Sequence, residues 1–245
     1  MAEAAEMTGY PWILALFAVV YTLIASIFYE KWFTAGGVGD SPGKFRTPAR
    51  AIKLFMLRKS MGLLLFGIVP FMLIFYFAPS ISYDWLWGLP ESYQWLLVLA
   101  FALATVTTGF YGSRQEKVRE LYPEMRIETW KAPYFSVSVS GWFIYLVGYE
   151  FMFRGFLLFL TVPALGVPMA VALNVLLYSL LHWKKSIKEA LGAIPLGVVL
   201  CLLVFYTGSL LAPILVHLGL SASTEIFSFV RNPEMKMVRN GRHHQ

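Results

Sequence analysis

Long runs of apolar residues, separated by shorter charged segments, dominate this chain of 245 residues. A helix needs about 20 mostly apolar residues to cross about 30 Å of hydrocarbon. Seven runs approach that length and are predicted as membrane spans: 11–29, 60–78, 94–112, 139–161, 167–183, 190–206 and 209–229. The pattern therefore predicts an all-α fold, a polytopic membrane bundle of seven or eight transmembrane helices.

The segments between the spans divide one integral membrane domain, residues 1–245, into three parts. We expect three helices with basic cytoplasmic loops over residues 1–130, a four-helix core over residues 131–230, and a cytoplasmic tail over residues 231–245. The first span lacks the basic flank and the cleavage site of a signal peptide, so we expect it to remain a helix.

The two basic loops also contain residues that predict breaks and short helices. Glycine and proline at positions 36–43 predict a break in the chain, and residues 47–59 are expected to form a surface helix whose cations meet anionic headgroups. The charged stretch 113–131 is expected to form a short interfacial helix that is broken at Pro123.

Composition and charge support the membrane assignment. Apolar residues make up 58% of the chain and charged residues 14%, whereas a soluble domain carries about 25% charged residues. Of the 20 Lys and Arg residues, 19 fall in alternate connecting segments. The positive-inside rule then places the N-terminus outside and the C-terminus in the cytoplasm. The positions of these cations account for the net charge of +6, so we expect the lipid bilayer, and no nucleic acid, as a partner.

Ionisable residues inside the spans are the candidates for function. Glu150 and Arg154 are four residues apart on one helix, while His182 and His217 lie in or at the end of two later spans. Such groups are costly in a bilayer and usually face one another or a water-filled cavity. The alternative for Glu150 and Arg154 is a buried ion pair that ties helices together, and the alternative for His182 is a histidine at the membrane interface.

His217, Ser221 and Glu225 follow one another at intervals of four residues. This spacing places all three on one face of a helix. A single polar residue could serve as a helix–helix hydrogen bond, but a stripe of three predicts the lining of a cavity. The rise of 1.5 Å per residue places Glu150, His182 and His217 between the bilayer centre and the cytoplasmic side, so one pocket that opens inward is expected.

A carboxylate beside two imidazoles can support amide hydrolysis without a metal ion. The carboxylate would take a proton from water, and the imidazoles would orient the water or stabilise the oxyanion. The chemical alternative is zinc, since two histidines and one glutamate are a sufficient protein ligand set. The HExxH spacing is missing and Arg154 would oppose a cation, so we expect no cofactor or metal. The single cysteine, Cys201, is expected to be a small core residue.

Three segments in this order resemble one family of membrane proteins. Tyr149–Gly155 resembles the EExxxRG motif of the CAAX-processing and bacteriocin-processing (CPBP, or Abi) endopeptidases, Tyr178–His182 resembles their FxxxH motif, and His217–Ser221 resembles their HxxxN motif. Order and spacing agree over about residues 135–225. The resemblance implies a bundle of about eight membrane helices, a glutamate-activated water, and a location in the bacterial inner membrane.

The resemblance also implies roles for the matched residues. His182 assists the water, His217 contributes to the oxyanion hole, and Glu150 with Arg154 takes the positions of the second glutamate and the arginine. The chain departs from the family at two positions, since Tyr149 replaces the first glutamate, which is usually assigned as the base, and Ser221 replaces the asparagine. A tyrosine with an ordinary pKa near 10 cannot replace a resting carboxylate. Tyr178 in place of phenylalanine is a mild change.

Three functional hypotheses remain at this point. The first is an intramembrane endopeptidase that acts on a membrane-associated or lipidated protein, with Glu150 as the base, His182 as its partner, and His217 with Ser221 as oxyanion donors. The second is a non-catalytic relative that binds a membrane partner for immunity or assembly, which Tyr149 favours. The third is a proton-coupled transporter, for which no inverted repeat or pair of broken helices is visible.

Overall fold

The computed structural model describes residues 10–35, 45–77, 88–183 and 187–238. The elements in these residues are α2 (Pro11–Ala35), α3 (Pro48–Leu63), the π-helix η1 (Leu64–Ile68), α4 (Val69–Phe77), α5 (Gln94–Gly112), α6 (Glu116–Leu121), β1 (Thr129–Trp130), α7 (Ala132–Glu150), the π-helix η3 (Phe151–Leu157), α8 (Leu158–His182), α9 (Ile187–Thr207), α10 (Leu211–Arg231) and β2 (Lys236–Met237). The predicted all-α class is confirmed.

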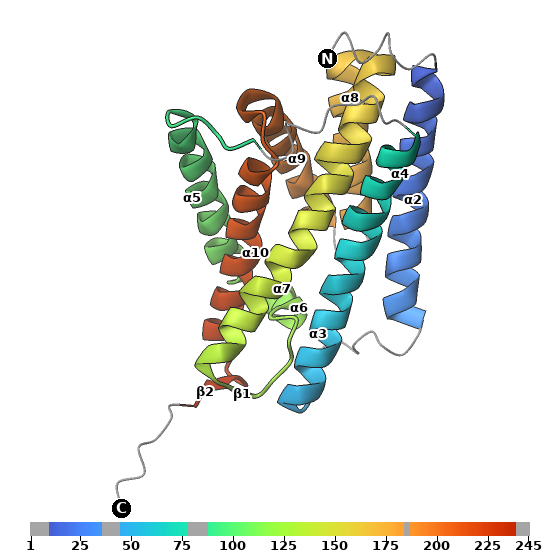
Figure 1. Ribbon diagram of the computed structural model, residues 1–245. Helices are drawn as coiled ribbons and strands as arrows, with labels where there is room; N and C mark the ends of the chain where they lie inside the picture. The colour runs from blue at the N-terminus through green and yellow to red at the C-terminus, as the bar shows by residue number, and fades with distance from the viewer. Residues whose placement is uncertain (1–9, 36–44, 78–87, 184–186, 239–245) are drawn as a thin grey trace, which may run out of the picture.

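Six helices within the described ranges are long and apolar enough to cross a membrane. The fourth, Ala132–His182, contains α7, η3 and α8 and has 51 residues, which would extend about 75 Å if it were straight. It is bent at Gly166, whose φ of 72° is not helical, and Pro163 and Pro168 flank the bend. The chain therefore turns back at the upper end of the bundle (Figure 1), and the six helices account for the seven predicted spans.

The prediction of a separate surface helix over residues 47–59 is wrong. Residues 48–77 form one unbroken helical segment in which α3, η1 and α4 follow one another. One face of α3 is buried against α7, and this face includes Ala51, Phe55 and Lys59. Packing of this face holds the basic segment in line with the span instead of along the membrane surface. The predicted breakers at 36–43 lie outside the described residues.

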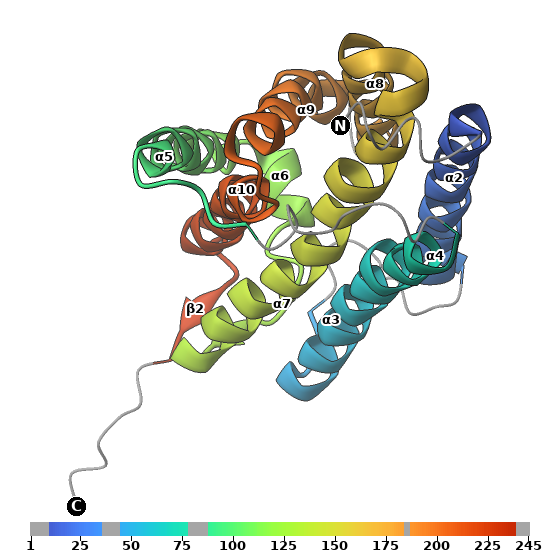
Figure 2. The ribbon, with the colours of Figure 1, turned by 45° about the horizontal axis from the view of Figure 1, so that its top comes forward.

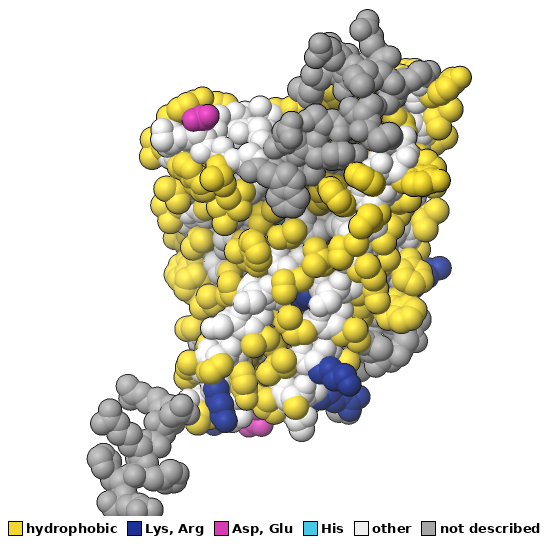
Figure 3. Space-filling model, in the orientation of Figure 1, with side chains coloured by type: hydrophobic (Ala, Val, Ile, Leu, Met, Phe, Trp, Pro, Cys, Tyr) yellow, Lys and Arg dark blue, Asp and Glu magenta, His cyan; other side chains and the backbone are white. Residues whose placement is uncertain are grey.

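The short helix expected between residues 113 and 131 is α6, which ends two residues before Pro123. Beyond it, β1 pairs in parallel with β2, so the segment after α10 is attached to the segment before α7. The face shown in Figure 3 is mostly apolar, and most of the visible lysines and arginines gather at its lower end. The predicted orientation of the termini relative to the membrane is still a prediction.

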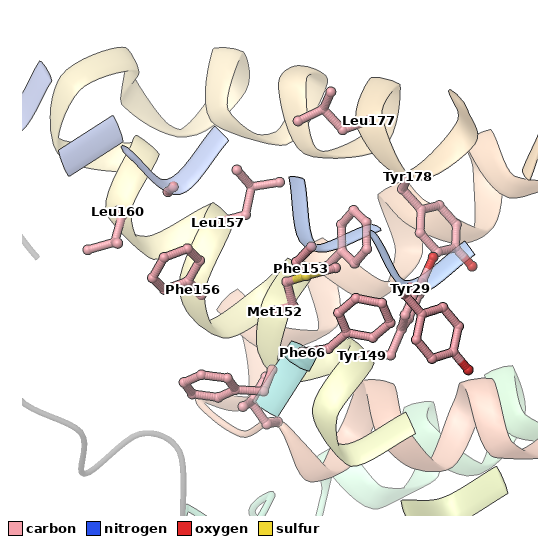
Figure 4. Close-up of a cluster of buried hydrophobic side chains, with 14 of the residues drawn as sticks. Tyr29, Phe66, Tyr149, Met152, Phe153, Phe156, Leu157, Leu160, Leu177 and Tyr178 are labelled. Carbon is pink, nitrogen blue, oxygen red and sulfur yellow. The ribbon is translucent and has the colours of Figure 1, made fainter. Parts of the chain in front are cut away.

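The helix α7 runs between α10 and α3 and contacts both (Figure 2). Its continuation η3 lies in the main core with α2 and α8. Figure 4 shows this core as a cluster of aromatic and aliphatic side chains in which Tyr149, Phe153 and Tyr178 lie close together. The residues that match the first family motif are therefore held on all sides by packed helices.

Gly148 allows the backbones of α7 and the α3–η1 helix to approach closely just before Tyr149. A Cβ atom at Gly148 would lie 2.8 Å from the Cα of Leu63, 3.1 Å from the carbonyl oxygen of Gly62 and 3.2 Å from the backbone nitrogen of Gly67. All three are backbone atoms, which cannot rotate away. This crossing fixes the position of α7 immediately before the candidate site.

We expect Gly148→Ala to destabilise the protein by about 1–3 kcal/mol, because an added methyl group must push two backbones apart. Thermal unfolding in detergent would measure the loss. Gly112→Ala is the matched control, since a Cβ at Gly112 meets nothing within 4 Å. Equal melting temperatures for the two variants would contradict the close crossing.

Candidate functional site

A cavity of about 510 Å³ lies in the bundle, next to the segment that connects α5 to α7. Seven aromatic residues contribute to its wall: Tyr29, Phe66, Tyr122, Trp142, Tyr145, Tyr149 and Tyr178. The cavity brings together five of the residues predicted from the sequence: Tyr149, Tyr178, His182, His217 and Ser221. Glu150, Arg154 and Glu225 do not belong to the lining of this cavity.

Glu150 is fully buried and connects His217 to Arg154. Its Oε1 lies 2.5 Å from Nδ1 of His217, and its Oε2 lies 3.1 Å from a terminal nitrogen of the Arg154 guanidinium. Because an ionised carboxylate can only accept hydrogen bonds, Nδ1 of His217 is the donor. Nε2 is then the ring nitrogen of His217 that is left for a molecule in the cavity.

His182 is held in a similar way by a backbone group. Its Nδ1 lies 2.8 Å from the carbonyl oxygen of Tyr178, one turn earlier on α8. A carbonyl oxygen can only accept, so Nδ1 carries the proton and Nε2 of the neutral ring is an acceptor. The two histidines that line the cavity are therefore both oriented by the protein through Nδ1, His217 by a carboxylate and His182 by a backbone carbonyl.

Tyr178 packs between Arg154 and the two histidines. Its ring centre lies 4.6 Å from the guanidinium carbon of Arg154. The same ring lies 4.6 Å from the ring of His182 and 6.2 Å from the ring of His217, measured between centroids. The cation–π contact adds to the ion pair with Glu150 in stabilising the buried guanidinium. Arg154, Tyr178 and both histidines thus form one packed group.

Tyr149 takes the place in the cavity wall where the resemblance predicts a carboxylate. Its ring stacks on Tyr145 with 5.4 Å between centroids and lies 5.9 Å from the ring of His217. Consecutive residues of an α-helix point about 100° apart, so Tyr149 lines the cavity while its neighbour Glu150 does not. The carboxylate of Glu150 can act on the cavity through the imidazole of His217.

The polar stripe on α10 divides into two parts. Ser221, one turn after His217, lines the cavity with it. Glu225, one further turn along, accepts hydrogen bonds from the Trp142 indole at 3.0 Å, the Ser138 hydroxyl at 3.1 Å and the backbone N–H of Glu124 at 3.0 Å. Glu225 therefore fixes α7 and the preceding segment to α10, and both of its carboxylate oxygens accept hydrogen bonds from the protein.

Lys59 and Glu124 form an ion pair in the cavity wall that the sequence did not suggest. Nζ of Lys59 lies 2.9 Å from Oε2 of Glu124 and 3.2 Å from the centre of the Trp142 ring system. Lys59 is only 1% exposed. The sequence places both residues in basic or mixed loops, where a charge is usually solvated. A signal was present in the spacing of Ala51, Phe55 and Lys59, which puts the lysine on the buried face of α3.

No group of three or more His, Cys, Asp or Glu side chains that could hold a metal ion occurs in the parts of the chain that the structure describes. Cys201 is buried and donates to Asn174, with 3.4 Å between Sγ and Oδ1.

Comparison with known proteins gives one match. Residues 131–223 match the family model "Rce1-like: Type II CAAX prenyl endopeptidase Rce1-like". No curated protein and no solved structure matches the chain. The matched range runs from the start of α7 into α10 and contains the three motifs, so the resemblance to CAAX-processing endopeptidases is confirmed over this region. At the family level, the match supports a CAAX-protease-like intramembrane peptidase in an integral membrane protein.

The structural contacts of Glu225 give a direct prediction. Glu225→Ala leaves the Trp142 indole and the Glu124 backbone N–H without their acceptor, and each orphaned donor costs about 1–3 kcal/mol. We expect a clearly lower melting temperature for Glu225→Ala and a smaller loss for Glu225→Gln, whose amide oxygen can still accept. A melting temperature of Glu225→Ala equal to that of the wild type would contradict the three hydrogen bonds.

Proposed function

We propose that this Rce1-like chain is an intramembrane endopeptidase that hydrolyses a peptide bond of a membrane-associated or lipidated protein. The observation that carries the proposal is the contact between the Glu150 carboxylate and Nδ1 of His217, in a histidine that lines the cavity with His182. A carboxylate that orients an imidazole in this way is the arrangement by which proteins activate a nucleophile. We place the protein in the bacterial inner membrane, as the family resemblance implies.

The hydrogen bond between Glu150 and His217 supports a position for the attacking water at the other nitrogen of the His217 ring. The water would donate one hydrogen to Nε2 of His217, which is an acceptor when the ring is neutral, and His182 in the same cavity wall would help to orient the water. His217 then takes the first proton as the oxygen attacks the scissile carbonyl carbon. The negative charge of Glu150 stabilises the imidazolium that forms.

The remaining polar groups of the cavity suit the later steps. Ser221 and Tyr149 line the cavity together with His217, and their hydroxyls would donate hydrogen bonds to the oxyanion. As the tetrahedral intermediate collapses, the C–N bond breaks and the imidazolium of His217 returns its proton to the leaving amine. One water is consumed, and the products are a new carboxyl terminus and a new amino terminus.

These roles differ from the sequence-based hypothesis in three respects. Glu150 acts through His217 instead of contacting the water, because the carboxylate is fully buried and already holds Nδ1. His217 becomes the proton acceptor, and Ser221 is joined by Tyr149 as an oxyanion donor. No metal ion or cofactor is required for this sequence of steps. In the proposal, Arg154 keeps the charge of Glu150 balanced.

The test is cleavage of membrane-associated peptides by the purified protein. General-base catalysis contributes about 10²- to 10⁴-fold, so we expect His217→Ala to lower kcat/KM by that factor. Glu150→Gln should lower it by less, because the amide oxygen can still accept from Nδ1. Thr108→Val is the control, since Thr108 also lines the cavity but its hydroxyl bonds within α5. Equal cleavage by the wild type and a Glu150→Gln, His182→Ala double variant would refute the proposal.

The second candidate is a non-catalytic protein that binds a membrane partner in the same cavity. The observation that favours it is the phenol of Tyr149 in the cavity wall, with no carboxylate at that position. On this alternative, the wild type cleaves nothing, a stoichiometric partner co-purifies with it, and Tyr149→Glu creates cleavage. On the endopeptidase proposal, the wild type cleaves, and Tyr149→Phe lowers kcat because one oxyanion donor is lost.

A further inference from the structure

Asn174 is a buried amide on α8 whose hydrogen bonds connect three helical segments. Its side chain is fully buried. Its Nδ2 donates to the carbonyl oxygen of Phe153 in η3 at 2.6 Å, and its Oδ1 accepts from the thiol of Cys201 in α9. The orientation of the amide follows from its partners, because a carbonyl oxygen can only accept and must therefore face the NH2 group.

The partner of Asn174 lies in the unusual part of the long helix. The π-helix η3 begins directly after Glu150 and contains Arg154. π-Helical turns are rare and frequently occur at functional sites. The carbonyl oxygen of Phe153 accepts the backbone N–H of Leu158, five residues later, and also the amide of Asn174. Asn174 is thus a side-chain contact to the turn that carries the Arg154 guanidinium.

The spacing along α8 extends this contact to the candidate site. Asn174, Tyr178 and His182 are four residues apart and lie on one face of the helix. Asn174 bonds to the residue before Arg154, Tyr178 stacks on Arg154 itself, and the Tyr178 carbonyl holds His182. Figure 4 shows Tyr178 facing Phe153 and Tyr149 across the core. A shift of α8 along η3 would break the first contact and move the other two.

We infer that Asn174 is a positioning residue for the proposed reaction, which sets the register of α8 against η3 and so positions His182 in the cavity wall that it shares with His217. The inference rests on the proposed function for its catalytic consequence, but not for the geometry. An apolar side chain of similar volume keeps the packing, and Phe153 retains its backbone partner Leu158. Loss of the amide therefore releases the register without unfolding the helix.

The experiment compares Asn174→Leu with two control variants by steady-state kinetics and by NMR of ¹⁵N-labelled imidazoles. The signals are assigned with His182→Ala and His217→Ala. We expect Asn174→Leu to lower kcat by about 10- to 100-fold with KM changed less than about twofold, because small displacements of reacting groups are costly to the chemical step. We also expect it to shift the signals of His182 and His217.

Thr161→Val is the matched control, since Thr161 is also fully buried and its hydroxyl bonds to backbone carbonyls of the same long helix. Cys201→Ala is the second control, because it leaves the bond from Nδ2 to Phe153 in place. Neither control should change kcat or the imidazole signals. If Asn174→Leu does not fold, Asn174→Asp decides by the same two measurements, since it keeps Oδ1 for Cys201 and loses the donor to Phe153.

Unchanged imidazole signals in the Asn174 variant, or equal shifts in Thr161→Val, would overturn the inference. A wild-type protein without any cleavage would refute the proposed function, and the NMR comparison would still decide the role of Asn174. The two failures are therefore distinguishable.

Discussion

The contact between Glu150 and His217 is the interaction on which the site depends. It joins α7 to α10 across 67 residues of sequence, inside the bundle, with an Nδ1–Oε1 distance of 2.5 Å. A buried carboxylate is stable only when its charge and lone pairs are matched. The guanidinium of Arg154 matches the charge on one side, and the imidazole accepts the role of donor on the other. Removal of the guanidinium would leave an uncompensated buried charge, which typically costs about 3–5 kcal/mol, and removal of the imidazole would leave a carboxylate oxygen without its donor.

This requirement explains why so much of the structure converges on one turn of helix. The close approach at Gly148 fixes the position of α7 against the α3–η1 helix. The Tyr178 ring packs on the guanidinium of Arg154, and Asn174 donates a hydrogen bond to the π-helical turn. Each contact would be unremarkable alone in a soluble core. In a bilayer, where water cannot satisfy a misplaced charge, the same contacts decide whether the ion pair can form at all. The geometry of the polar site therefore depends directly on how the helices of the bundle pack.

The sequence predicted the features that depend on local composition. The apolar runs predicted the helices, and the spacing of the motifs indicated His182, His217 and Ser221, which line one cavity in the structure. Features that depend on contacts between distant segments could not be predicted in this way. Lys59 meets Glu124 because Lys59 on α3 and Tyr122 in the segment after α6 both pack against Trp142. The surface helix over residues 47–59 was predicted wrongly for the same reason, since a basic segment was judged by its charges and not by its buried face.

The roles proposed for Tyr149 and Glu150 depend on the direction in which each side chain leaves the helix, since consecutive residues point about 100° apart. The two residues are neighbours, and a carboxylate at position 149 would line the cavity, whereas the carboxylate at position 150 reaches it through a ring. An imidazole that is backed by a carboxylate is a base of a different strength and reach from a carboxylate in contact with water. In the proposed mechanism, the chain therefore keeps a group that can accept a proton although Tyr149 replaces the first glutamate of the motif. In the proposed mechanism, the atom that accepts the proton changes from a carboxylate oxygen to Nε2 of His217, and the phenol of Tyr149 serves as a donor at the position where the family motif has a glutamate.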